Sequence, residues 1–300
     1  MNRVAQHPVK AFAVALCAVG CLSLMDAVMK HLVLAIGIIA VSIWRSIVNL
    51  LLSGTLYLPR RLSWPSRSTL KIHISRGVLV TGLAFLFFWG IGRVPLAQAI
   101  ALTFIGPLIA LLLAALFLKE HIGSRSIIGS IAAFAGVIVI MLGQARAHIG
   151  SEAMLGSAAI LGSAICYAAN IVMMRPQAQA AGPLEINFFQ SLTVMIVWLI
   201  VLPFVGLPGS PGWQWPWIGV AALLSTCGTL LYGWAYARGE ASYLAITEYS
   251  AFLWASALGW LVFSEGVSLY TLGGALMIVG GCLLAARRRV AVLPEIDVAA

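Results

Sequence analysis

Long apolar stretches dominate this chain, and polar and charged residues gather in short segments between them. A helix needs about 20 apolar residues to cross a bilayer. The stretches predict ten spanning helices, at Ala11–Met29, Leu34–Leu58, Gly77–Ile91, Leu96–Leu118, Ile127–Leu142, Ala153–Met174, Ile186–Val205, Trp217–Ala237, Ala241–Phe263 and Leu269–Ala286. The third and fifth are short for a span, so we expect them to extend backwards into Ile72–Arg76 and Ser124–Ser126. The predicted fold class is an all-α polytopic membrane protein.

The connections and the composition leave no room for a soluble domain. Only Pro59–Lys71 and Gly206–Pro216 are long enough to form ordered loops between spans. Charged residues make up 9% of the 300 residues, against about 25% in a soluble domain, and the mean hydropathy is +1.02. All five cysteines fall inside predicted spans, where they serve as small packing residues rather than a disulfide or metal framework. We therefore expect the function to lie among the helices, without a cofactor or a metal.

The net charge of +9 reports membrane orientation. Lys and Arg accumulate in the cytoplasmic loops of membrane proteins. With the N-terminus inside, 14 of the 18 basic residues lie on the cytoplasmic side, Lys30, Arg93 and Arg146 lie outside, and Arg45 lies within a span. Both termini are therefore predicted to be cytoplasmic. The basic balance does not indicate nucleic-acid binding.

An internal repeat at a constant offset of 145 residues divides the chain into two units, 1–148 and 149–300. The matching pairs are Cys21 and Cys166, Met29 and Met174, Trp89 and Trp234, Arg93 and Arg238, Glu120 and Glu265, Gly129 and Gly274, and Gly136 and Gly281. Each unit carries five predicted helices, and an odd number requires the second unit to enter the membrane from the opposite face. Inverted repeats are typical of secondary transporters, which bind substrate near the midplane between the repeats and work by alternating access.

One sequence pattern connects the chain to a known family. The run Pro95-Leu96-Ala97-Gln98-Ala99, continued through Pro107 to Lys119-Glu120, has a weaker echo that ends at Glu265. This pattern, on five plus five helices, resembles the EamA family of the drug/metabolite transporter superfamily, and within it the YddG-type amino-acid exporters. The resemblance implies export of small metabolites, often amino acids, across the bacterial inner membrane. It also implies a central cavity lined by the third, fourth, eighth and ninth helices with the first and sixth, while the fifth and tenth serve as scaffold.

Three ionisable residues are predicted at membrane depth, where such residues are rare and costly: Asp26, Arg45 and Glu248. Asp26 and Arg45 lie roughly 22 and 20 Å from the cytoplasmic ends of the first two helices at 1.5 Å per residue. A structural Asp26–Arg45 ion pair is one interpretation, and a cavity-facing Asp26 that contacts a substrate amine or relays a proton is the other. Glu248 is a candidate carrier of a coupling proton or, alternatively, a polar residue in a water-filled vestibule.

Polar and aromatic residues on the helices that the resemblance places at the cavity complete the predicted site. They are candidates for substrate contact, since aromatic rings stack on substrate rings or cations. The predicted set, besides Asp26 and Glu248, is Trp89, Gln98, Tyr167, Asn170, Trp234, Tyr243 and Tyr249. Helix packing is the alternative role for each. Pro107 is a candidate hinge, because it frees a backbone carbonyl inside the fourth helix.

Other functional classes receive less support. An intramembrane enzyme would need a nucleophile with a base at membrane depth, but the chain has no G-x-S-x-G or H-E-x-x-H motif and its five histidines are predicted at loops or helix ends. We therefore expect a transporter rather than an enzyme. A zwitterionic substrate suits mixed charges and amides, so neutral and aromatic amino acids lead, with organic-cation efflux as the alternative. Protons are a candidate coupling ion, and the lipid bilayer is the expected surrounding partner. The oligomeric state stays open.

Overall fold

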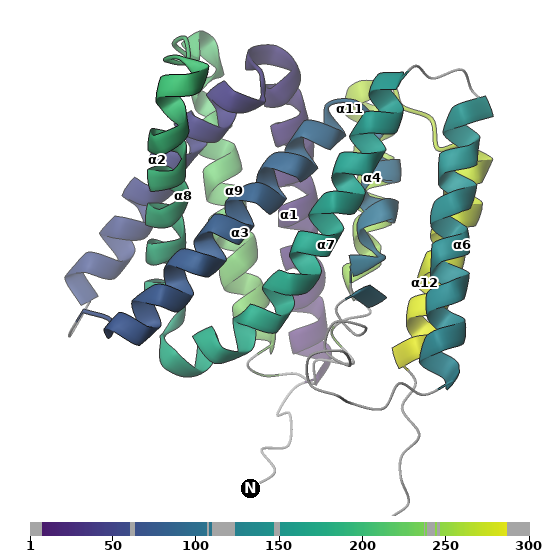
Figure 1. The fold of residues 1–300 in the computed structure, drawn as a ribbon, viewed down its shortest axis with the longest axis horizontal. Coiled ribbons are helices and arrows are strands. Elements are labelled where there is room, and N and C mark those ends of the chain that lie inside the picture. The colour runs from purple at the N-terminus through teal and green to yellow at the C-terminus, as the bar shows by residue number, and fades with distance from the viewer. Residues whose placement is uncertain are drawn as a thin grey trace, which may run out of the picture.

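A computed structural model describes residues 8–60, 64–106, 108–109, 124–146, 151–236, 238, 244 and 247–286. All regular elements in these ranges are helical (Figure 1). They are α1 (Pro8–Ile36), α2 (Ile38–Tyr57), α3 (Arg67–Ile91), α4 (Leu96–Thr103), α6 (Ser124–Arg146), α7 (Ser151–Ala180), α8 (Pro183–Val205), α9 (Trp215–Tyr236), α11 (Ser250–Phe263) and α12 (Leu269–Ala286), with short 3-10 turns at Leu58–Arg60 and Gly212–Gln214.

Within the described ranges, six helices are long and apolar enough to cross a membrane, and α6, α11 and α12 contain shorter apolar segments. The chain is therefore a multi-pass membrane protein, while ten spans remain a prediction. The backward extension of the third and fifth stretches is confirmed by the starts of α3 and α6. The predicted C-terminal boundary of the loop Pro59–Lys71 is wrong, because its last five residues belong to α3. The hydroxyl of Ser66 accepts a hydrogen bond from the Thr69 N–H and caps α3, so the helix begins at Arg67. Such a cap satisfies one of the free N–H groups of a helix start.

The 145-residue offset holds for whole helices. Shifted by 145, α1, α2, α3 and α6 fall on α7, α8, α9 and α12 within a few residues. The contacts between helices also correspond under this shift. The α1–α9 contact corresponds to the α7–α3 contact, and the α2–α9 contact corresponds to the α8–α3 contact. In Figure 1, α1 runs upward from the end marked N and α7 runs downward. The fold therefore places equivalent helices in equivalent packing positions.

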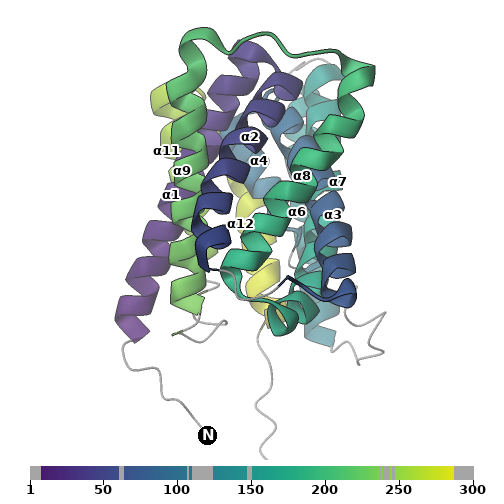
Figure 2. The same ribbon diagram turned by 90° about the vertical axis from the view of Figure 1, so that its left-hand side faces the viewer.

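The shortest and longest described connections between spans lie at the same end of the molecule. Gly37 joins α1 to α2 with φ of 80°, a left-handed conformation that glycine adopts without steric cost. The longer connection after α8 crosses above α2, as Figure 2 shows. There the Trp44 indole N–H donates to the Gly209 carbonyl at 3.0 Å, and the Trp44 and Trp215 rings meet edge to face. These contacts bind the connection to α2.

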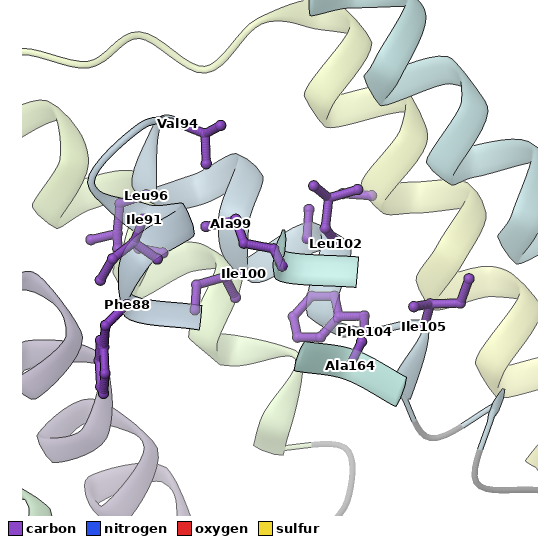
Figure 3. Close-up of a cluster of buried hydrophobic side chains, with 14 of the residues drawn as sticks. Phe88, Ile91, Val94, Leu96, Ala99, Ile100, Leu102, Phe104, Ile105 and Ala164 are labelled. Carbon is purple, nitrogen blue, oxygen red and sulfur yellow. The ribbon is translucent and has the colours of Figure 1, made fainter. Parts of the chain in front are cut away.

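Close contact between α6 and α12 uses the two glycine pairs that match at the 145-residue offset. A Cβ added to Gly136 would lie 2.6 Å from the carbonyl oxygen of Gly274, and Gly281 faces Gly129 equally closely. Small residues permit such backbone approach between membrane helices. The main buried cluster includes residues of this pair and of the other helices, with Phe88, Leu102 and Phe104 among its members (Figure 3). The small glycine faces therefore pack within one chain.

Candidate functional site

A polar cavity of about 150 Å³ lies among α2, α3, α8 and α9. Of these helices, α3 and α9 correspond to the third and eighth that the family resemblance implies, whereas α2 and α8 are the second and seventh. The lining residues are Ser42, Arg45, Ser46, Asn49, Val80, Thr81, Ala84, Phe85, Phe88, Asn187, Gln190, Ser191, Val194, Trp198, Ser225, Thr226 and Thr229. Hydroxyl and amide groups dominate the lining. Such a surface can bind a small polar solute.

The lining follows the internal repeat almost completely. Fourteen of the seventeen lining residues form seven pairs separated by 145 positions. These pairs are Ser42 and Asn187, Arg45 and Gln190, Ser46 and Ser191, Asn49 and Val194, Val80 and Ser225, Thr81 and Thr226, and Ala84 and Thr229. The three residues without a lining mate are the aromatic ones, Phe85, Phe88 and Trp198. The cavity is therefore built jointly and almost equally by the two repeats.

Arg45 is the charged residue of this lining. Its Nη1 donates to the Met29 sulfur at 3.7 Å, its guanidinium carbon lies 5.2 Å from the centre of the Phe88 ring, and its Nε is buried without a hydrogen-bond partner. The ion pairs of the described residues do not include one between Asp26 and Arg45, so the expected direct pair is not seen. The guanidinium instead reaches Met29, one helical turn beyond Asp26 on the same face of α1.

The predicted tryptophans lie under arginines at helix ends. The Arg93 guanidinium lies 3.6 Å from the Trp89 ring centre and donates to the Trp89 carbonyl. Arg238 does the same with Trp234, at 4.3 Å from the ring centre. These contacts are cation–π interactions at equivalent places in the two repeats. Neither tryptophan lines the described cavity.

Other predicted residues lie near the contact between α4 and α11. The Tyr232 hydroxyl donates to the Glu248 carboxylate at 2.7 Å, so Glu248 has a partner that the sequence did not indicate. Tyr249 meets Phe104, its mate at the 145 offset, edge to face with ring centres 5.4 Å apart. Gln98 is buried on α4. These residues pack beside the cavity helices without lining the described cavity.

Gln98 and Tyr167 contact other helices of the same region. The Gln98 amide donates to the Ser157 hydroxyl of α7 at 3.3 Å. The Tyr167 ring lies so close to Gly106 that a Cβ added to this glycine would be 2.9 Å from it. The remaining predictions, Tyr243 and Pro107, lie outside the described residues.

Asn170 belongs to a buried polar network between α3, α7 and α8. The Arg76 guanidinium donates to the Asn170 side-chain oxygen at 2.8 Å and to the Gln177 side-chain oxygen. The Gln177 amide is 2.7 Å from Nδ1 of His73, whose Nε2 lies 3.2 Å from the Glu185 carboxylate. His73 is fully buried inside α3, so its predicted place at a loop or helix end is wrong. A chain of hydrogen bonds thus joins three helices.

A second buried charge is Lys30, near the C-terminal end of α1. Its ammonium group donates to the Glu265 carboxylate and, at 2.7 Å, to the Val94 carbonyl. The same carboxylate accepts the backbone N–H of Leu96 at 2.8 Å. This group of contacts connects α1, the start of α4 and the segment after α11. In the described ranges no three His, Cys, Asp or Glu side chains are grouped as a metal site needs.

Sequence reasoning missed two kinds of residue. The distribution of basic residues treats Lys30 as an outside charge and Arg76 as a cytoplasmic one, although both are buried. The cavity-lining hydroxyl and amide residues of α2 and α8 were passed over as well. Their signal was available, since Ser42, Ser46 and Asn49 occur at i, i+4 and i+7 and so share one face of a helix within an otherwise apolar stretch.

Comparison with known proteins agrees with this architecture. Residues 9–142 and 154–287 each match the EamA-like transporter family, again 145 residues apart. The chain is 24% identical over 282 residues to the pseudopaline exporter CntI of Pseudomonas aeruginosa, covering 89% of this chain and 92% of that protein. It is 26% identical over 216 residues to an uncharacterized transporter of Helicobacter pylori, covering 69% and 71%. A crystal structure aligns with a TM-score of 0.60 at 19% identity, covering 94% of this chain and all of the other. The chain belongs to the EamA-like transporter family.

Proposed function

We propose that this chain is a secondary-active exporter of small metabolites, with neutral and aromatic amino acids as its leading substrates. It works by alternating access between two inverted repeats. The observation that carries this proposal is the cavity whose lining residues occupy equivalent positions in both repeats. A substrate bound there contacts both halves at once. A relative named as a pseudopaline exporter supports the outward direction.

Two halves of similar structure and opposite orientation give inward-open and outward-open states of comparable energy. A carrier then needs contacts that form in one state and break in the other. We propose the Lys30–Glu265 pair as such a contact, because with its bonds to Val94 and Leu96 it connects α1, α4 and the segment after α11. The Lys and Arg distribution predicts that this contact lies toward the outer side of the membrane.

Organic-cation efflux is the second candidate function, and Asp26 is the observation that favours it. This carboxylate lies within α1 and forms no ion pair among those of the described ranges. The described cavity lining, however, contains Arg45 and no Asp or Glu. A cationic ligand would therefore meet a positive charge in the cavity, which favours the amino-acid proposal.

Counterflow into proteoliposomes that contain the purified protein tests the function. Labelled L-phenylalanine and L-leucine on one side, and labelled tetraphenylphosphonium in a parallel series, distinguish amino acids from organic cations. We expect counterflow of the amino acids and none of the cation. Cation counterflow alone would support efflux of organic cations, and counterflow of neither solute would contradict transport of both classes.

Two additions to this assay address Asp26 and the coupling ion. Asp26→Asn is expected to fold normally and to lose proton-gradient-driven efflux if Asp26 faces the transport route. Unchanged efflux would leave Asp26 a structural residue. Efflux measured with and without a proton gradient shows whether protons drive export, and a rate independent of the gradient would exclude proton coupling.

A further inference from the structure

We infer that Arg45 is the carboxylate-binding residue of the cavity and that the transported metabolite carries a carboxylate group. This inference rests on the proposed function, because it assigns the substrate class of the same cavity. The observation behind it is the one repeat pair of the lining whose two residues differ in charge. Every other repeat pair in the cavity is uncharged, whereas Arg45 is paired with Gln190 across the repeat. The positive charge thus lies on the side of the first repeat only.

The hydrogen-bonding state of Arg45 leaves it available for a ligand. A guanidinium has five N–H donors in a planar fork that matches the two oxygens of a carboxylate. In the described structure its hydrogen bond goes to a methionine sulfur, which is a weak acceptor, and its Nε has no partner at all. A buried donor without a partner costs about 1–3 kcal/mol, and more for a charged group. A ligand that accepts these hydrogen bonds removes that cost.

The surroundings of Arg45 favour an anionic group over a cationic one. No Asp or Glu occurs among the described residues that line the cavity. Asp26 forms no ion pair with Arg45 among those of the described residues, so a ligand carboxylate has no salt bridge to displace. Because the described lining carries no acidic side chain, the guanidinium attracts a carboxylate there without like-charge repulsion from the lining.

The rest of the lining sets the remaining chemistry of the ligand. Amide and hydroxyl groups such as those of Asn187 and Gln190 can accept hydrogen bonds from an ammonium or hydroxyl group. The three lining residues outside the repeat pairs, Phe85, Phe88 and Trp198, supply an apolar surface. The ligand is therefore a small carboxylic acid with an apolar side chain, in zwitterionic or simple anionic form.

A panel of phenylalanine analogues tests the assignment on the unaltered protein. L-Phenylalanine and 3-phenylpropionate keep the carboxylate, whereas L-phenylalaninamide and phenethylamine lack it. We expect the two acids to raise the thermal unfolding temperature of the detergent-purified protein and to compete in counterflow at least tenfold better than the amide and the amine. Equal competition by acid and amide would overturn the inference. The two acids differ in the ammonium group, so comparing them distinguishes a zwitterionic from a purely anionic ligand.

Variants then locate the carboxylate site. Arg45→Gln copies the residue of the second repeat, and we expect it to weaken competition by L-phenylalanine at least tenfold while changing that of the amide less than threefold. Arg60→Gln is the matched control, because Arg60 is an exposed arginine directly after the same helix. Unchanged binding of the acid by Arg45→Gln would overturn the assignment. If Arg45→Gln does not fold, Arg45→Lys is expected to keep a preference for acids with reduced affinity, and an unreduced affinity would count against the assignment.

The outcomes separate this inference from the proposed function. Counterflow of solutes without any preference for the carboxylate would contradict the inference and leave the transporter intact. Stabilisation by the acids that depends on Arg45, without counterflow of any solute, would support the binding site and contradict the transport proposal. Neither stabilisation nor counterflow would contradict both.

Discussion

The Lys30–Glu265 pair is expected to be one of the strongest single interactions in this fold. The side chains of the two residues are 4% and 21% exposed. Replacing Lys30 by Met leaves the Val94 carbonyl and the Glu265 carboxylate without their donor. Breaking a buried ion pair from one side costs about 3–5 kcal/mol. The carboxylate is partly exposed and keeps its hydrogen bond from the Leu96 N–H, so we expect the low end, about 3 kcal/mol, for Lys30→Met.

A double-mutant cycle isolates the energy of the pair itself. Glu265→Gln retains an acceptor for the Leu96 N–H but removes the charge, for an expected loss of about 2 kcal/mol. Coupling between contacting groups is typically about 0.5–3 kcal/mol. The double variant is therefore expected to lose about 1–2 kcal/mol less than the sum of the single losses.

The measurement is the free energy of unfolding in detergent micelles, obtained by titration with sodium dodecyl sulfate and followed by circular dichroism. Lys71→Met, at an exposed position of α3, is the control and is expected to stay within about 0.5 kcal/mol of the unaltered protein. If the losses of the two single variants add fully in the double variant, the two charges are not coupled and the reasoning is wrong.

Three further predictions concern packing, the buried network and coupling. Gly274→Ala places a Cβ 2.6 Å from a backbone oxygen of α6 and is expected to cost about 1–3 kcal/mol in unfolding free energy, whereas Gly273→Ala meets no atom within 4 Å and serves as its control. Gln177→Leu removes one of the two acceptors of the buried Arg76 guanidinium and the partner of His73 Nδ1, and is expected to cost about 2–3 kcal/mol. Gln179→Leu, on the exposed face of the same helix, is expected to be nearly neutral in the same unfolding assay. Glu248→Gln is expected to abolish stimulation of efflux by a proton gradient while counterflow persists, and persistent stimulation would exclude Glu248 as the proton carrier.

Much of the fold followed from apolar patterning, because a bilayer leaves few ways to satisfy backbone hydrogen bonds other than helices. Both predicted ends of α12 and the predicted C-terminal end of α8 agree with the structure to the residue, whereas α8 begins three residues before the predicted Ile186. The error at α1 is instructive. The apolar pattern predicts an end at Met29, because a lysine follows, yet the helix continues to Ile36. Lys30 is tolerated inside it because a partner 235 positions later in the chain neutralises its charge, and such a partner is invisible in local sequence.

The site was predicted less well than the fold, for a different physical reason. Sequence alone favours deep ionisable and aromatic residues, because each is conspicuous in an apolar helix. An aromatic ring beside an arginine four residues later, as at Trp89 and Arg93, is equally well explained by a cation–π contact along one helix. A hydroxyl residue in a membrane helix is inconspicuous, because it can satisfy its own polar group by donating to a carbonyl of the preceding turn, as Ser46 and Thr81 do. Single-residue reasoning therefore undervalues the residues that line the cavity.

The internal repeat could have identified those residues without a structure. The two halves are, in effect, an alignment of two related sequences, and a position that is polar in both halves of an apolar helix has kept its polarity in two opposite settings. Ser46 with Ser191 and Thr81 with Thr226 are such positions, and both pairs line the cavity. Helix packing does not require a hydroxyl at both equivalent positions, because alanine would fit there. A polar solute bound between the halves favours a hydroxyl at both positions. In this duplicated chain, polar residues shared by the repeats therefore indicate the shared cavity, and the carboxylate-binding role proposed for Arg45 rests on the one lining charge that the second repeat lacks.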